Sequence, residues 1–229
     1  MRNIFTIHRI FAVAVCTLSA AGALNAQTEE RPVSVGVIGG VGLNDPFDSR
    51  SVDILTPSNI RYSFSNHRYI VGPMVQVNLP WHLGLEVDAL YRRYSYTSDA
   101  APFDSIVTTR TSSNTWEFPL LLKYRVFGGP LSPFLVAGPN FRYVSEGERT
   151  SSVLSGDPNT GPNSVARELK NSFAPGFSIG GGVSLGAKSL KIEPQFRYTR
   201  WGWENFASNP TGFFKSNQNQ VDFLLNVRF

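Results

Sequence analysis

Glu86 and Asp88 form the residue pair whose spacing comes nearest to a catalytic arrangement. Two carboxylates two positions apart on a strand point the same way, about 6.6 Å apart at a rise of ~3.3 Å per residue. An inverting glycosidase holds its acid and its base ~6.5–9.5 Å apart. The same spacing suits two acids that pair with Lys and Arg of neighbouring strands. We favour this second interpretation, because the surrounding pattern leaves no cleft for a polysaccharide.

Histidine, the usual general base and zinc ligand, occurs only at His8, His67 and His82. No HExxH or related spacing is present, so we expect neither a metal nor another cofactor. A lipid hydrolase of the Ser-His-acid type needs a histidine beside a serine. His67, two residues after Ser65, is the one candidate, and a solvated loop histidine is the favoured interpretation.

Two further motifs have structural alternatives. The segment Gly36-Val37-Ile38-Gly39-Gly40-Val41-Gly42 resembles a dinucleotide loop, but the Asn44-Asp45-Pro46 that follows breaks the helix which such a loop requires. Glycines that permit close backbone approach within a strand explain it better. Trp201 and Trp203 beside Arg200 could contact lipopolysaccharide or a glycan, but interface anchoring is the favoured interpretation.

The chain begins like a secretory signal peptide. Arg2 and Arg9 precede an apolar run over 10–24, and Asn25-Ala26-Gln27 provides the small-residue exit. We therefore expect a signal peptide over 1–26 and a single domain over 27–229. Removal of the signal peptide leaves 19 basic and 17 acidic residues and takes away Cys16, the only cysteine. The mature chain should therefore contain no disulfide, and it shows no basic stripe typical of nucleic-acid binding.

Strands dominate the expected domain. Charged residues are only 17%, whereas Gly and Pro number 20 and 15, a composition that favours strands and turns over helices. Apolar and polar residues alternate with a period of two in eight segments of about nine to fourteen residues. A tilted strand needs about 9–11 residues to cross a membrane, whereas the mean strand of a soluble protein has only ~5–6 residues. These segments are 33–41, 69–79, 81–92, 115–127, 131–144, 172–186, 189–199 and 221–229.

The links between these segments alternate in length. Short links fall at 79–81, 127–130 and 187–189, and long polar links cover 42–68, 98–112, 145–171 and 202–216. An antiparallel meander would gather the short turns at one end and the long loops at the other. Transmembrane β-barrels have short periplasmic turns, long extracellular loops and an even strand number. The pattern thus predicts an all-β, eight-stranded antiparallel up-and-down transmembrane barrel.

The apolar face should meet lipid rather than form a lipocalin-like interior. Aromatic residues lie near the ends of the apolar faces, as in an interfacial girdle, and charges lie at mid-strand on the opposite faces. Eight strands leave an interior just wide enough for side chains, so these charges should pair. The expected lumen network comprises Glu86, Asp88, Arg92, Glu117, Lys123, Arg125, Arg142, Lys191, Glu193, Arg197, Asp222 and Arg228.

The eight amphipathic segments, the leader and terminal Phe229 resemble the outer-membrane β-barrel domain proteins of Gram-negative bacteria, the porin family in a loose sense. Segments 117–124 and 133–139 are similar to recurrent stretches of that family's central hairpin. The resemblance implies export and insertion into the outer membrane among lipid and lipopolysaccharide. It also implies reading of a terminal signal by the barrel-assembly machinery, here Val221, Phe223, Leu225, Val227 and Phe229.

We expect a monomeric barrel without catalysis, with a structural or surface-interaction role carried by the loops over 42–68 and 145–171. The loop partner is unidentified. The alternatives are a narrow pore for small solutes and an outer-membrane lipid-modifying enzyme. Residues 27–31 should form a short periplasmic lead-in, because eight crossings return both ends to one side.

Overall fold

The computed structural model describes residues 32–45, 47–49, 60–64, 68–100, 107–127, 131–145, 148–153, 169–187, 190–206 and 214–229. The expected signal peptide, the lead-in and His67 lie outside these residues, as do most of the loops over 42–68 and 145–171. In the described part, no helix is long and apolar enough to cross a membrane.

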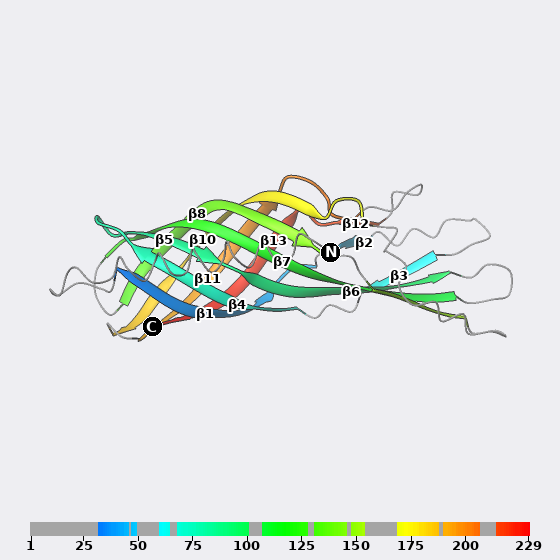
Figure 1. Ribbon diagram of the computed structural model, residues 1–229, viewed down its shortest axis with the longest axis horizontal. Helices are drawn as coiled ribbons and strands as arrows, with labels where there is room; N and C mark the ends of the chain where they lie inside the picture. Colours follow the sequence, from blue (N-terminus) through cyan, green and yellow to red (C-terminus); the bar gives the residue numbers. More distant parts are fainter. Residues whose placement is uncertain are drawn as a thin grey trace, which may run out of the picture.

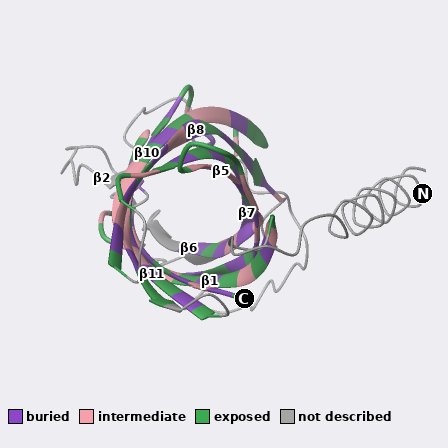
Figure 2. Cartoon of the chain, turned by 90° about the vertical axis from the view of Figure 1, so that its left-hand side faces the viewer, coloured by how far each residue is buried: buried purple, intermediate pink, exposed green. Residues whose placement is uncertain are grey.

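The predicted all-β fold is confirmed: eight antiparallel crossings close into a barrel (Figures 1 and 2). Each crossing pairs with its sequence neighbour, and the first pairs with the last, so the closed wall has no free edge. The crossings are β1 (Val33–Gly42), β4 (Tyr69–Asn78), β5 (Leu83–Asp88) with β6 (Leu90–Ala100), β7 (Val107–Arg125), β8 (Leu131–Val144), β10 (Phe173–Ala187), β11 (Leu190–Trp201) and β13 (Asn219–Arg228).

A single proline explains why the third crossing consists of two strands. Pro73 of β4 lies opposite Ala89, between the register pairs Met74↔Asp88 and Val71↔Tyr91. The Ala89 N–H donates to the Pro73 carbonyl at 3.1 Å, but proline has no N–H to return the bond. Only one of the two backbone hydrogen bonds of the Pro73–Ala89 pair can therefore form, and the register continues unchanged beyond Ala89.

The strand register fixes the width of the barrel. Stepping from partner to partner around the wall, a path that starts at Val33 returns to β1 at Leu43, ten residues further along. The path runs Val33, Val77, Leu85, Leu122, Ala137, Ile179, Tyr198, Val221, Leu43. With eight strands, this stagger gives a tilt of about 40° and a backbone radius of about 8 Å. Side chains alone can fill such an interior.

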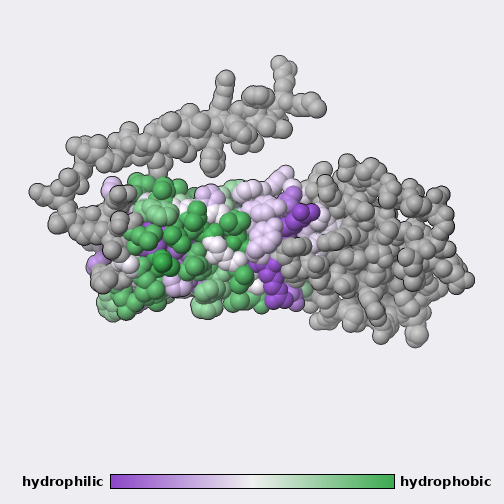
Figure 3. Space-filling model, turned by 90° about the horizontal axis from the view of Figure 1, so that it is seen from below, coloured by the Kyte–Doolittle hydropathy of each residue, from purple (hydrophilic) through white to green (hydrophobic). Residues whose placement is uncertain are grey.

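Side chains alternate along the strands as predicted, with apolar residues outside and polar residues inside the barrel. On β7, Leu122 is 50% exposed, whereas the neighbouring Lys123 is fully buried. Apolar residues cover the outside of the wall, and a hydrophilic zone follows toward the long-loop end (Figure 3). Tyr91 and Tyr198 lie on the outer faces of β6 and β11, and their hydroxyls donate to Asn114 Oδ1 (2.8 Å) and Asn219 Oδ1 (2.7 Å). This arrangement is that of an interfacial aromatic girdle.

The prediction of a long loop over 98–112 was wrong. Strands β6 and β7 continue through most of it and remain paired to Ala100↔Val107. Short strands extend this hairpin: β3 (Ile60–Phe64) pairs with β6, and β9 (Glu148–Val153) with β7. Serine and threonine made these segments look like loops, but threonine is β-branched and favours extended backbone.

Two smaller boundary corrections concern the ends of other strands. The crossing expected from residue 81 begins at Leu83, because Trp81 and His82 have φ of 61° and 62° and form the turn after β4. The expected loop over 202–216 contains β12 (Phe214–Ser216), which pairs with β2 (Phe47–Ser49) in a separate small sheet.

Candidate functional site

A chain of alternating charges occupies the interior near the short-turn end. Lys123 Nζ lies 2.5 Å from Glu193 Oε2 and 3.2 Å from Glu86 Oε2, with all three side chains fully shielded from solvent. Arg228 donates to Glu193 at 3.0 Å. Arg197 donates to Glu86 at 3.0 Å and to Asp88 at 2.9 Å. This Lys123 chain (Arg228, Glu193, Lys123, Glu86, Arg197 and Asp88) holds three positive and three negative charges.

Strand alternation places these side chains together. Glu86, Asp88 and Lys123 occupy inward positions of β5 and β7, and the other members come from β11 and β13 across the barrel. The Lys123 ammonium also lies 4.1 Å from the centroid of the Phe134 ring and 3.1 Å from Gln76 Oε1. Charged groups of this kind are tolerated in a dry interior only when each finds such partners.

Two apolar clusters pack inside the barrel next to the charged residues. One consists of Ile38, Ile70, Met74, Leu90 and Leu224, and the other of Leu121, Phe134 and Val136. All are inward-facing residues of wall strands, and each is at most 2% exposed. Apolar packing therefore lies beside the ionic groups, and the second cluster contacts the Lys123 ammonium through Phe134.

A second ionic cluster lies toward the long-loop end. Arg92 contacts Glu117 Oε1 at 3.1 Å and Asp222 Oδ2 at 3.0 Å, and Arg142 donates to Glu117 at 3.0 Å. Gln220 donates to Glu117 (3.2 Å) and to Asp222 (2.6 Å), and accepts a hydrogen bond from Arg142. This Arg92 cluster (Arg92, Glu117, Arg142, Gln220 and Asp222) also has no net formal charge.

An aromatic layer covers part of the Arg92 cluster. The Trp201 ring centroid is 3.8 Å from the Arg142 guanidinium carbon, and its indole N–H donates to Gln220 at 3.0 Å. Further out, Phe47 makes edge-on contacts with Tyr94 at 5.7 Å and Phe206 at 5.5 Å. The segment between β11 and β12 is held by Ser216 Oγ, which accepts from the backbone N–H of Asn205 at 2.9 Å.

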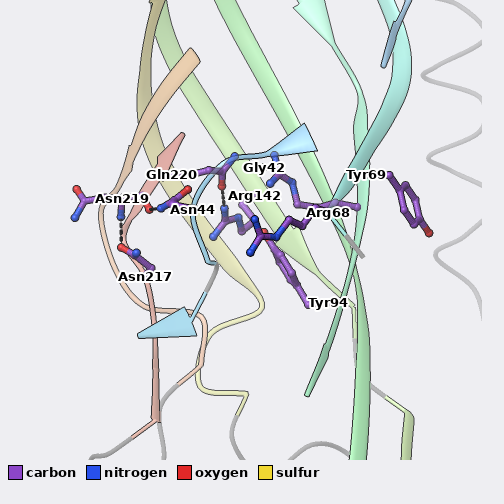
Figure 4. A pocket seen from close by; sticks show the side chains of 10 residues that line it. Gly42, Asn44, Arg68, Tyr69, Tyr94, Arg142, Asn217, Asn219 and Gln220 are labelled. Carbon is purple, nitrogen blue, oxygen red and sulfur yellow. Dashed lines mark hydrogen bonds between the residues drawn. The ribbon is translucent and has the colours of Figure 1, made fainter. Parts of the chain in front are cut away.

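A cavity opens beside this layer at the long-loop end, with a volume of about 430 Å³ when its open mouth is included (Figure 4). Three arginines, four amides and two tyrosines line it together with a glycine, and no lining residue is acidic. They are Gly42, Asn44, Arg68, Tyr69, Arg92, Tyr94, Arg142, Asn217, Asn219 and Gln220.

Of the twelve expected lumen residues, eleven are buried and Arg125 is half-buried. Ten belong to the Lys123 chain and the Arg92 cluster. Arg125 lies apart and donates to Asn78 at 2.6 Å, and Lys191 is buried near the short-turn end. Glu86 and Asp88 share Arg197 as their partner, so the favoured ion-pair interpretation describes this acid pair. Val221, Phe223, Leu225, Val227 and Phe229 alternate on the outward face.

Sequence reasoning missed the apolar clusters and the cavity. The other inward positions of the strand that holds Ile38 carry only serine and glycine, and Ile70 and Met74 share their strand with an inward glycine and amides, so the few apolar residues gave little signal. Arg68 lay in an expected loop, and Tyr94 beyond the expected end of a strand. The glycine-rich segment 36–42 forms β1, in agreement with the prediction that it is not a nucleotide loop.

The closed wall, its apolar outer surface and its paired interior define an outer-membrane β-barrel of eight strands. Within this class, residues 25–206 match the family model described as outer membrane protein beta-barrel domain. The chain belongs to that family, which places it in the outer membrane of a Gram-negative cell. Comparison with curated proteins gives no match.

Solved structures with a similar fold include three outer-membrane proteins. OprG of Pseudomonas aeruginosa is 11% identical, with a TM-score of 0.47 over 86% of this chain and 94% of that one. Neisserial surface protein A is 13% identical, with a TM-score of 0.40 over 88% and 98%. Ail of Yersinia pestis, solved with the heparin analogue sucrose octasulfate, is 9% identical, with a TM-score of 0.37 over 86% and 99%.

Proposed function

We propose that the protein is a non-enzymatic, non-conducting barrel that presents its long-loop end to partners at the cell surface. The observation that carries this proposal is the filled interior. A solute that crossed the lumen would have to displace the Lys123 chain, the apolar clusters and the Arg92 cluster. Breaking such buried pairs costs about 3–5 kcal/mol each, which makes steady passage unfavourable.

Catalysis has no residue set to support it in the described part of the chain. The cavity is lined by neither histidine nor carboxylate, and His82 lies in the short turn after β4 at the opposite end. The remaining candidate for Ser-His-acid chemistry is His67, outside the described residues. Phospholipid or lipid A release by refolded protein should be absent, and release that disappears in His67→Ala would overturn this part of the proposal.

Single-channel recording in planar bilayers tests the absence of conduction. Refolded protein should give no steady conductance steps, whereas a known porin added to the same bilayer should. Reproducible steps of uniform size from this protein would overturn the proposal in favour of a small-solute pore.

The proposed role includes a monomeric barrel that is exported through a signal peptide over 1–26 and delivered by the barrel-assembly machinery. The outward alternation from Val221 to Phe229 supports recognition of the last strand. The girdle at Tyr91 and Tyr198, with Arg200 exposed close by, suits contact with outer-membrane lipid and lipopolysaccharide. Protease added to whole cells should spare a tag placed at 27–31, and cleavage of that tag would reverse the proposed orientation.

A further inference from the structure

We infer that the cavity at the long-loop end binds an acidic saccharide, a sugar that carries a carboxylate, sulfate or phosphate group. This inference names a partner class for the surface role and rests on the proposed function, because it requires the long-loop end to face the cell exterior. Three features of the cavity support it: the donors it presents, the amides and the phenol around them, and the rigidity of its floor.

The charged groups that line the cavity are all guanidinium groups. Arg68 stands at the rim with its side chain 52% exposed and makes one ion pair, from Nη2 to Asp45 at 3.0 Å. Its Nη1 and Nε donate to none of the described residues. On the floor, Arg92 Nη1 and Arg142 Nη1 make only long hydrogen bonds, to Asp222 at 3.4 Å and to Asn205 at 3.5 Å. Planar guanidinium donors that are incompletely engaged match a carboxylate, sulfate or phosphate.

The carboxylates that neutralise these arginines lie behind them. Glu117 contacts Arg92 and Arg142, Asp222 contacts Arg92, and neither acid lines the cavity. Asp45 contacts Arg68 at the rim and is likewise not a lining residue. A ligand would therefore meet N–H donors first, with the acids fixing the donors in place.

The rest of the lining suits sugar hydroxyls. Carboxamides of Asn44, Asn217, Asn219 and Gln220 offer both donors and acceptors, which a simple inorganic anion does not need. Tyr94 adds a buried phenol, whereas the Tyr69 ring points away from the other lining residues and lies 6.4 Å from the Tyr91 ring (Figure 4).

The floor is organised before any ligand binds. Arg142 is held between Glu117 and the Trp201 ring, and Tyr94 packs on Phe47. Binding then requires little side-chain ordering, which preserves affinity. Because Trp201 contacts both Arg142 and Gln220, its fluorescence should respond to occupancy.

Gly42 provides a way to fill the cavity without removing a charge. A Cβ at this position would lie 3.7 Å from Asp222 Oδ1 and 3.9 Å from Arg92 Nη1, which is ordinary contact distance. Gly42→Val, whose branched side chain suits a strand, should therefore fold and project into the cavity. Arg93 supplies the matched charge control: it is an exposed arginine next to Arg92 that faces outward, donates to Ser112 and does not line the cavity.

The test is titration of refolded protein in phosphatidylcholine vesicles with glucuronate, glucose 6-sulfate, glucose and inorganic sulfate, followed by calorimetry and tryptophan fluorescence. We expect the two acidic sugars to bind at least tenfold more tightly than either glucose or inorganic sulfate. Arg68→Gln should weaken their binding at least fivefold, Gly42→Val should abolish it, and Arg93→Gln should stay within twofold of the parent. Trp201→Phe should remove most of the fluorescence response.

Several results would overturn the inference: equal affinity for glucuronate and glucose, sulfate binding as tight as that of glucose 6-sulfate, full affinity in Gly42→Val, or equal losses in Arg68→Gln and Arg93→Gln. Vesicles that contain lipid A distinguish the source of the sugar. If lipid A in the vesicles competes with glucuronate for the cavity, the natural ligand is a glycolipid headgroup. If lipid A does not compete, the natural ligand is a free saccharide. Channel activity together with binding contradicts the proposed function alone, whereas absence of both contradicts this inference alone.

Discussion

Replacing Lys123 by methionine tests whether the interior is dry. Methionine keeps most of the length of the side chain and can pack on Phe134, but it leaves Glu86 and Glu193 with one cation fewer. Each acid retains one arginine, Arg197 or Arg228, at 3.0 Å. The change therefore converts a neutral chain of charges into one with a net charge of −1.

The expected loss of stability depends on the surrounding medium. Two unit charges 3 Å apart attract by about 1.4 kcal/mol in a water-like medium and by about 5.5 kcal/mol at an effective dielectric constant of 20. Removal of one partner from a buried pair costs about 3–5 kcal/mol. Because two arginines remain and methionine packs well, we expect Lys123→Met to lower the free energy of unfolding by about 3 kcal/mol.

Urea unfolding in phospholipid vesicles, followed by tryptophan fluorescence, measures this loss. The double variant Lys123→Met with Glu193→Gln restores neutrality and should recover at least about 1.5 kcal/mol, roughly half the single-variant loss. Arg93→Met on the exposed face is the control and should change stability by less than about 1 kcal/mol. A loss below 1 kcal/mol in Lys123→Met, with no recovery in the double variant, would refute a dry interior.

Three further outcomes follow from the wall of the barrel. Leu122→Arg puts a charge on the lipid face and should cost about 2–4 kcal/mol in vesicle unfolding; no loss would contradict the face assignment. The double variant Trp81→Asn with His82→Gly places residues that tolerate a positive φ in the turn after β4, so the hairpin should form more favourably and the midpoint of urea unfolding should rise. An unchanged or lower midpoint would show that Trp81, which is 84% exposed, stabilises the protein as an anchor by more than its backbone strain costs. Gly182→Ala brings a Cβ within 2.3 Å of the Pro194 carbonyl oxygen, so the refolded yield on cold gel electrophoresis should fall markedly; wild-type yield would mean that the backbone yields there.

The wall of the barrel could be predicted from the sequence, because lipid on one side and a packed lumen on the other enforce strict alternation. Leu122, which faces lipid, and the neighbouring Lys123, which faces the lumen, are an example of this alternation. Only part of the residues that fill the lumen could be predicted. The charged residues stand out in the sequence, whereas Ile38, Ile70 and Met74 lie on strands whose other inward positions carry serine, glycine or amide residues. Which acid pairs with which base depends on the stagger of ten residues around the barrel. This stagger is a property of the closed sheet and cannot be predicted from the sequence of any single strand.

The strand extensions and the cavity were hidden for different reasons. Composition identified 98–112 as polar but could not show that β6 and β7 would stay paired beyond the membrane. Arg68 directly precedes β4, Tyr94 lies in β6 and Gln220 in β13, and these three residues converge only because the register brings the ends of their strands to one rim.

The ionic layers also constrain the order of folding. Lys123 and Glu193 are 70 residues apart, Arg92 and Asp222 are 130 apart, and Arg228 reaches Ser34 across 194 residues and across the seam where the first and last strands meet. Few of these contacts can form while the sheet is open, since neighbouring hairpins supply only some of the partners. Five acids and five bases must then stay hydrated until the seam closes, and their dehydration coincides with closure. Barrel formation should therefore end in one late, strongly cooperative step that expels water from the lumen.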